Sequence, residues 1–383
     1  MPGLALDRCG IALLGALALV SLGALSAEEA WSAIDVPTIA LLFGLMVVAA
    51  QFRLSGFFSA LTGRFTRAPL APERLLFLWI AIAGALSALL VNDVVCLALA
   101  PIVVEIATAK RLDPVPFLLG LAAGSNVGSA ATLIGNPQNI LIGQELHLSF
   151  RAYLADALVV SALGLVVTWW VIARAYHGRF EVESAPVSTE RPAFDAWQTG
   201  KGVAVLALVV AAFLFGRWPR EVVALAAAAV LLLSRRLASS RFLGLIDWPL
   251  LVLFIGLFVV HHAFEVTGLA ARAMAVAAAS GVDLSQPVAL FVATPILSNL
   301  VSNVPAVMLL LPAAKHPLAG PILALSSTLA GNLLLVGSIA NLIVVEQAAR
   351  LGIQIGWREH ARVGVPITLI TLALAAAWLW LRA

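Results

Sequence analysis

Two stretches of this chain decide its fold: Asn92-Asp93-Val94 and Asn303-Val304-Pro305. A proline follows nine residues after each asparagine, and a second polar stretch comes further on. That second stretch reads Gly135-Asn136-Pro137-Gln138-Asn139 in the first copy and Gly337-Ser338-Ile339-Ala340-Asn341 in the second. Backbone groups freed by a helix break inside hydrocarbon must find partners in protein or in a watery cavity. A matched pair of such breaks is typical of the binding site of a membrane transporter.

The composition around these stretches is that of a polytopic membrane protein. Apolar residues make up 62% of the 383 residues and charged residues 11%, against about 25% charged in a soluble domain. Many uncharged windows reach the roughly 20 residues that cross a hydrocarbon core. The net charge of +3 is spread over loops and is explained by topology, so we expect no nucleic-acid partner. The partners expected are membrane lipid, a small-anion substrate and a coupling ion.

The predicted fold is all-α, with two inverted repeats, about nine transmembrane helices, two re-entrant helical hairpins and two broken helices. The apolar pattern places spans at 9–27, 37–52, 114–146 (broken), 153–173, 202–216, 221–234, 249–263, 321–346 (broken) and 364–381. The N-terminal repeat is 1–173, with hairpin 74–110 and broken helix 114–146. A cytoplasmic linker covers 174–201. The C-terminal repeat is 202–383, with hairpin 287–315 and broken helix 321–346.

Loop charge supports this topology. With the N-terminus in the cytoplasm, six of the 23 basic residues fall outside, and the other 17 fall inside, as the positive-inside rule expects. The first hairpin then opens to the cytoplasm and the second to the outside. Segments 54–67 and 265–280 are amphipathic and could lie at the membrane interface. The first apolar segment is read as a retained span, and a cleaved signal peptide ending at Leu25-Ser26-Ala27 is the alternative.

Helix ends at the tips and breaks are the candidate ligand groups. Free N–H groups at helix N-termini suit an anion, whereas carbonyl, amide and hydroxyl oxygens suit a hard cation such as sodium. The predicted substrate- or ion-binding residues are Asn92, Asp93, Ser125, Asn126, Thr132, Gly135, Asn136, Pro137, Asn139, Ser302, Asn303, Thr328, Asn332, Gly337, Ser338 and Asn341. A sodium ion is expected near Asn92 and Gly135, or near Asn303 and Gly337. The glycines are expected to allow close approach and positive φ.

Asp93 is the sharpest single residue in this set. An acid within a membrane span usually faces a polar interior, where it relays protons or meets an ion. Val304 stands at the matching place in the second copy, so the two halves of the site differ chemically. Asp93 could also serve as a helix N-cap at the hairpin tip.

Other chemistry finds little support in the residues. His261-His262 lacks the i, i+4 spacing of a metalloprotease helix and has no evident third ligand. Only Cys9 and Cys96 are present, which makes a structural disulfide or cysteine metal site improbable. The sequence has no P-loop pattern and no nucleophile–base pair, so we expect neither an enzyme nor a bound cofactor beyond sodium or a proton.

Together these motifs resemble the ion transporter superfamily, which includes divalent anion–sodium symporters of the anion permease (CitMHS) type, arsenite-pump membrane subunits and NhaD-type sodium–proton antiporters. Asn92-Asp93, Asn303-Val304-Pro305 and the run from Ser125 to Asn139 look closest to the arsenite-pump and NhaD branch. The resemblance implies a scaffold, a moving transport domain and often a homodimer. In the symporter branch, Ser-Asn-Thr triplets at the tips hold substrate and sodium, and both tips depart from that triplet here.

The sequence therefore predicts a secondary active transporter for a small anion, a carboxylate or an inorganic oxyanion. It would work by an elevator-type mechanism coupled to protons or sodium. A sodium–proton antiporter of the NhaD type or an arsenite extrusion permease is the alternative. The expected location is a bacterial inner membrane.

Overall fold

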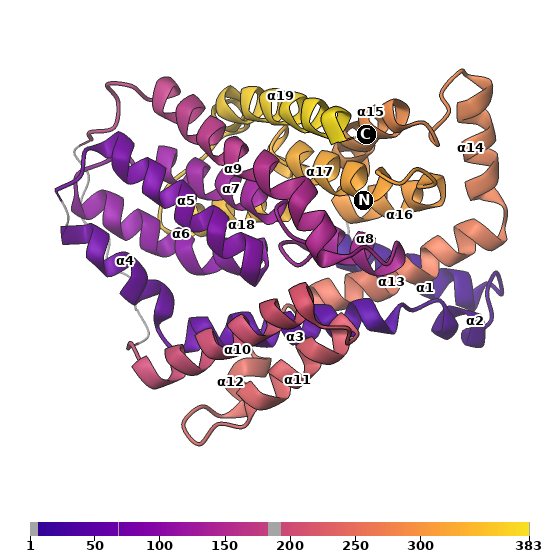
Figure 1. Ribbon diagram of the computed structural model, residues 1–383, viewed down its shortest axis with the longest axis horizontal. Coiled ribbons are helices and arrows are strands. Elements are labelled where there is room, and N and C mark those ends of the chain that lie inside the picture. The colour runs from indigo at the N-terminus through magenta and orange to yellow at the C-terminus, as the bar shows by residue number, and fades with distance from the viewer. Residues whose placement is uncertain (1–6, 68, 183–192, 383) are drawn as a thin grey trace.

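A computed structural model describes residues 7–67, 69–182 and 193–382. The described chain is built from helices, and its one isolated β-bridge joins Leu112 and Glu181. The helices form two layers (Figure 1). The lower layer in that view, which we call the scaffold layer, holds α1 (Arg8–Ser21), α2 (Ala27–Ser32), α3 (Val36–Leu54), α10 (Ala196–Phe215), α11 (Arg220–Leu232), α12 (Ser239–Leu243) and α13 (Trp248–Val266).

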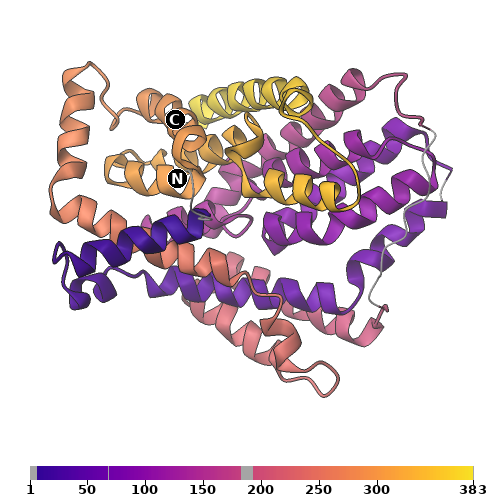
Figure 2. The same ribbon diagram turned by 180° about the vertical axis from the view of Figure 1, so that it is seen from behind.

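The upper layer, which we call the core layer, carries both polar motifs (Figures 1 and 2). Its first half is α5 (Pro72–Leu90), α6 (Asn92–Ala109), α7 (Pro114–Ser129), α8 (Pro137–Glu145) and α9 (Phe150–Ala175). Its second half is α15 (Pro287–Val301), α16 (Asn303–Leu310), η1 (Leu311–Ala313), α17 (Ala319–Ala330), η2 (Leu335–Gly337), α18 (Ile339–Arg350) and α19 (Trp357–Arg382). Helices α4 (Phe57–Arg67) and α14 (Leu269–Ala279) run between the layers at opposite ends of the molecule.

Among the described residues, seven helices are long and apolar enough to cross a membrane: α3, α5, α6, α9, α10, α13 and α19. The expected count of about nine is made differently: it includes the two broken helices, whose halves are too short to be counted here, and it leaves out α5 and α6, the arms of the first predicted hairpin, which are each long enough to span. Helix α1 has 14 residues and α11 has 13, which correspond to about 21 and 20 Å, shorter than a hydrocarbon core of about 30 Å. The expected span 9–27 stops early because the chain turns after Ser21, where Gly23 has a φ of +73°.

Both helices that the sequence predicts to be broken are interrupted in the structure. The first is interrupted between α7 and α8, and the second between α17 and α18. The predicted linker 174–201 is partly helical, since α10 begins at Ala196. Its residues 183–192 lie outside the described residues, and the segment before them pairs with the start of α7 through a 2.7 Å hydrogen bond from Asp113 N to Phe180 O.

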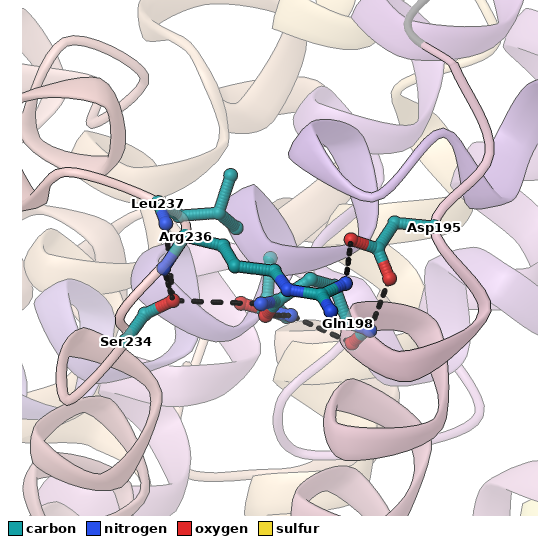
Figure 3. A network of polar contacts seen from close by, with 6 residues as sticks. Asp195, Gln198, Ser234, Arg236 and Leu237 are labelled. Carbon is teal, nitrogen blue, oxygen red and sulfur yellow. Dashed lines mark hydrogen bonds and ion pairs between the residues drawn. The ribbon is translucent and has the colours of Figure 1, made fainter.

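The start of α10 is fixed by a polar network within the scaffold layer (Figure 3). The Asp195 carboxylate caps α10 by accepting from Gln198 N at 3.1 Å, and it pairs with Arg236 at 3.3 Å. Ser234 Oγ accepts from the main-chain N–H groups of Arg236 and Leu237. The N–H groups at the helix start and the turn after α11 are thus stabilised by one small cluster.

Two polar contacts join the layers at the far end of α8. Arg220 Nη2, at the start of α11, donates to Gly143 O at 2.5 Å. Gln144 Nε2 donates to Glu221 Oε2 at 3.1 Å. The helices pack mainly within each layer, so these contacts lie across the boundary between the layers.

Candidate functional site

The two hairpin tips share an unusual backbone. A single residue, Val91, separates α5 from α6, and a single residue, Ser302, separates α15 from α16. Val91 has φ 62° and ψ 120°, and Ser302 has φ 83° and ψ 159°. Residues other than glycine adopt such angles rarely and at a cost of about 1–3 kcal/mol. The strain places Asn92 and Asn303 as the first residues of α6 and α16, with the helix N-termini at the tips.

The two breaks are also built alike. Asn136 and Ser338 follow the break glycines, and each is the N-cap of the next half-helix. Asn136 Oδ1 accepts from Asn139 N at 2.9 Å, and Ser338 Oγ accepts from Ala340 N at 3.2 Å. Pro137 stands at the first position of α8, where its missing N–H costs nothing. Helices α8 and α18 therefore begin in the middle of the core layer.

Gly135 and Gly337 are required for close approach and not for positive φ. Neither is among the glycines with positive φ in the described chain, so that expectation is wrong. A Cβ on Gly135 would lie 2.1 Å from Ser129 O, and one on Gly337 would lie 2.8 Å from Asn299 Oδ1. The strained conformations belong to the residues before the tip asparagines instead.

Asn126 joins the first half of the site to the second. Its Oδ1 accepts from Asn92 Nδ2 at 3.2 Å and from Ser338 Oγ at 2.9 Å. Its Nδ2 donates to Asn332 Oδ1 at 2.8 Å and to Asn341 Oδ1 at 3.1 Å. One buried amide thus contacts the first tip and the second break.

Thr328 makes the reciprocal connection. It lies nine residues before Gly337, as Asn126 lies nine before Gly135. Its hydroxyl donates to Asn139 Oδ1 at 3.2 Å and accepts from Asn136 Nδ2 at 3.3 Å. The pairs Asn126–Asn341 and Thr328–Asn139 therefore match each other across the two halves. Asn139 and Asn341 also donate to main-chain oxygens seven residues earlier, at Thr132 and Leu334.

Other predicted residues support this polar core. Ser125 Oγ lies 2.8 Å from Ser87 Oγ and 3.3 Å from Asn92 O, and Thr132 Oγ1 donates to Ala88 O. Asn303 Oδ1 accepts from Ser298 Oγ. The structure brings together the predicted residues from both copies, with Asn92, Asn126, Asn136, Asn139, Asn332 and Asn341 all buried.

Tip and break are closed differently in the two halves. Asn92 N donates to Gly135 O at 2.9 Å, which joins the first tip directly to the first break. Among the described main-chain groups no such bond links Asn303 to Gly337. There, the Arg8 guanidinium donates to Ser302 Oγ at 3.3 Å and to Val336 O at 3.0 Å. Arg8 is therefore a contact of the second tip, although the sequence placed it among the loop charges.

Two groups near the first tip lack partners. Asp93 is 7% exposed, and the described chain offers its carboxylate neither a hydrogen bond nor an ion pair. It is not an N-cap, because Val91 holds that position and makes no side-chain bond there. Asn92 Oδ1 is also buried without a hydrogen-bond donor. An acid and a free amide oxygen thus stand side by side in sequence at the start of α6.

Several contributing residues were missed by the sequence interpretation. Gln138 Nε2 donates to Thr328, and Tyr153 OH accepts from Asn139 Nδ2 at 3.1 Å. His360 Nε2 lies 3.0 Å from Asn332 O. Gln138 could have been found, because it stands inside the first break motif. Tyr153 lies in an apolar helix and His360 in the charged first turns of α19, and neither belongs to a motif.

A cavity of about 310 Å³ opens away from the tips, between the layers. Glu145 and Leu141 line it from α8, Met308 from α16, and His261 and Glu265 from α13. His261 Nε2 lies 3.5 Å from Glu265 Oε1. The described residues contain no cluster of three His, Cys, Asp or Glu side chains that could hold a metal ion.

Comparison with known proteins places this chain in a transporter family. The family sequence model described as "Citrate transporter" (CitMHS) matches residues 4–323, and the chain belongs to that family. It is 30% identical to a "46 kDa membrane protein" of Mycobacterium leprae, over 97% of this chain and 93% of the relative. It is 30% identical to "Silicon efflux transporter LSI3" of Oryza sativa subsp. japonica, over 98% and 92%. It is 32% identical to "Inner membrane protein YbiR" of Escherichia coli, over 87% and 85%. The protein is an integral membrane transporter and not an enzyme.

Proposed function

We propose that this protein is a secondary active transporter that moves a small anion, a carboxylate or an inorganic oxyanion, at the polar core. The observation that carries the proposal is the meeting of three helix N-termini, those of α6, α8 and α18, around Asn126 and Thr328. Free N–H groups and the partial positive charge of helix N-termini favour an anion.

The relatives agree with a small oxygen-rich substrate. The family is described by citrate, and one relative by silicon efflux. In this chain the tips read Val91-Asn92-Asp93 and Ser302-Asn303-Val304, so hydroxyls are fewer than in a Ser-Asn-Thr tip. A smaller inorganic oxyanion needs fewer hydrogen bonds than a tricarboxylate, and we favour it.

An elevator-type mechanism fits the two layers. The reciprocal pairs Asn126–Asn341 and Thr328–Asn139 support two inverted repeats with re-entrant hairpins, packed as one moving body. Alternating access in such proteins is largely rigid-body motion of one bundle against another. The scaffold layer would stay fixed, with apolar residues such as Leu208 and Phe215 of α10 turned outward, 70% and 78% exposed, toward lipid or a homodimer partner. We expect a bacterial inner membrane and a cytoplasmic N-terminus.

We assign the coupling of substrate transport to sodium or protons to the first tip. A sodium ion near Asn92 and Gly135 would give Asn92 Oδ1 the partner that it lacks. Asp93 would supply the negative charge that makes cation and proton compete for one place. In the second copy, Asn303 and Gly337 would offer oxygens to a sodium ion, but no acidic residue stands beside them in the sequence.

The same two groups favour a second candidate function. An acid and a free amide oxygen at one tip are sufficient for exchange of sodium against protons, as in an antiporter of the NhaD type. That function needs no anion at the helix N-termini. An arsenite extrusion permease would also use this core, with an uncharged oxyacid as substrate.

The deciding experiment is uptake into proteoliposomes by the parent protein and the Asp93→Asn variant. Silicate, arsenite, citrate and phosphate are tested with and without sodium and a pH gradient, and sodium-driven proton movement is recorded in the absence of anion. We expect the parent to accumulate an anion in response to the pH gradient. In Asp93→Asn, anion uptake should no longer depend on the pH gradient. Asp156→Asn is the control, because Asp156 is already paired with Arg382 at 2.7 Å. Sodium–proton exchange without anion uptake would select the antiporter.

A further inference from the structure

The second tip lies at the edge of the core layer, unlike the first. Val91 is 1% exposed and Asn92 is 4% exposed. By contrast Leu300 and Val301, which lead into Ser302, are 74% and 43% exposed, and Val336 of the second break is 53% exposed. The first tip is enclosed by surrounding protein, whereas in the second copy the residues that lead into the tip are exposed and Asn303 itself is buried, at 9%.

Arg8 comes to this exposed tip from the scaffold layer. It is the first residue of α1, which packs along α13 (Figure 2). Ala16 and Leu25 bury themselves against Val259 and Ala263 of α13, and this small apolar cluster fixes the α1 segment. The guanidinium therefore crosses the layer boundary from an anchored helix.

We propose that Arg8 is a positioning residue for the second half of the site, closing the second tip onto the second break. In the first half the N–H of Asn92 does this by donating to Gly135 O. In the second half one guanidinium donates to both Ser302 Oγ and Val336 O. A planar fork of donors can bridge two acceptors, which an ammonium on a flexible stem does less well. The inference rests on the proposed function only for its effect on transport.

The contact has a consequence for motion between the layers. Ser302 and Val336 belong to the core layer and Arg8 to the scaffold layer. A core layer that slides must therefore leave Arg8 behind, and the second tip is then free to separate from its break. Arg8 thus holds the second half of the site closed in the arrangement described here. After the core layer has moved, Arg8 no longer contacts this half of the site and releases it.

The test is amide hydrogen exchange of the full-length protein in lipid nanodiscs, read by mass spectrometry over residues 298–306 and 334–340. We expect Arg8→Gln to accelerate exchange in both segments by about tenfold, the worth of one charge-assisted hydrogen bond. Arg8→Lys should give an intermediate increase. Arg151→Gln, which removes another exposed arginine at the start of α9, should match the parent.

Two further measurements complete the experiment: transport kinetics, and an intact mass that shows whether the purified protein contains residue 8. Arg8→Gln should raise the KM for the accepted anion more than it lowers the maximal rate. If Arg8→Gln fails to insert, Ser302→Ala removes the acceptor from the other side and should accelerate exchange in the same segments. Unchanged exchange in these variants, or an intact mass showing that purified protein lacks residue 8, would overturn the inference. A parent that moves no anion refutes the proposed function, while the exchange comparison still decides the role of Arg8.

Discussion

At the scale of single residues, the polar core depends on amides that have several partners each. Asn126 contacts four polar groups, and its side chain is buried. A buried group that loses its partner costs about 1–3 kcal/mol. The two halves of the core are therefore coupled through one residue whose removal affects both.

We predict that Asn126→Leu lowers the free energy of unfolding by at least about 1–3 kcal/mol, because Asn92 and Asn332 lose their partner. Thermal unfolding in detergent, followed by tryptophan fluorescence, measures the effect as a drop in Tm. The control is Ser161→Ala, since Ser161 Oγ is buried without any hydrogen bond and its loss should be neutral or stabilising. Equal Tm values for both variants would show that the Asn126 bonds contribute nothing.

The break glycines should differ in tolerance. A methyl group on Gly135 meets a main-chain oxygen at 2.1 Å, whereas on Gly337 it meets the side-chain oxygen of Asn299 at 2.8 Å and the main-chain oxygen of Gly331 at 3.2 Å, so less has to shift. We predict that Gly135→Ala abolishes transport and lowers Tm, while Gly337→Ala keeps partial transport. Gly200→Ala on α10 is the control, because its added methyl meets nothing within 4 Å. Full activity of Gly135→Ala in the uptake assay would contradict the close-packed break.

At the scale of elements, sequence patterns located the breaks but not what holds them. Asn, Gly and Pro in apolar sequence mark the starts of α8 and α18, which fall inside the predicted break motifs, whereas α7 and α17 already end at Ser129 and Ala330. The partners of Thr328 lie about 190 residues away in sequence, and spacing alone does not reveal a tertiary contact. The positive φ of Val91 was unpredictable, since a β-branched residue is the least expected choice there. Hydropathy also overestimated α1, because it does not detect a turn at small residues.

The start of α10 carries a prediction about pH. The main-chain N–H of Gln198, with help from Arg236, holds the pKa of the Asp195 carboxyl below its usual range. A depressed pKa means that the folded protein is stabilised above the unfolded pKa and loses this as pH falls through the folded pKa. We predict that Asp195→Asn lowers Tm slightly at pH 7, and that the difference shrinks as the pH falls below the unfolded pKa of about 3.9. A difference that stays constant as the pH is lowered through this range would show that charge is not its cause.

At the scale of the whole molecule, the boundary between the layers is where movement would occur. The contacts of Gly143 with Arg220 and of Gln144 with Glu221 join α8 to α11 across it. Sliding of the core layer would break both. Apolar residues of both layers, such as Leu41 and Ile140, also belong to one buried cluster, so sliding would have to exchange apolar contacts as well.

We predict that joining the layers stops transport. With Cys9 and Cys96 replaced by Ala, the pair Gln144→Cys and Glu221→Cys should form a disulfide under mild oxidation and lose transport, and reduction should restore it. Each single variant should transport before and after oxidation. Undiminished uptake by the fully crosslinked protein, with crosslinking measured by gel shift, would exclude relative movement of α8 and α11.

The reciprocal contacts also bear on how the protein is made. Asn126, Asn136 and Asn139 depend on partners that are synthesised about two hundred residues later. At about 5–20 residues per second, the ribosome takes roughly 10–40 s to produce them. During that interval the amides of the first half, already in the membrane or its insertion machinery, lack their native hydrogen-bond partners. Completion of the polar core is therefore a late event in biogenesis, and a nascent chain arrested before residue 328 holds an unfinished core.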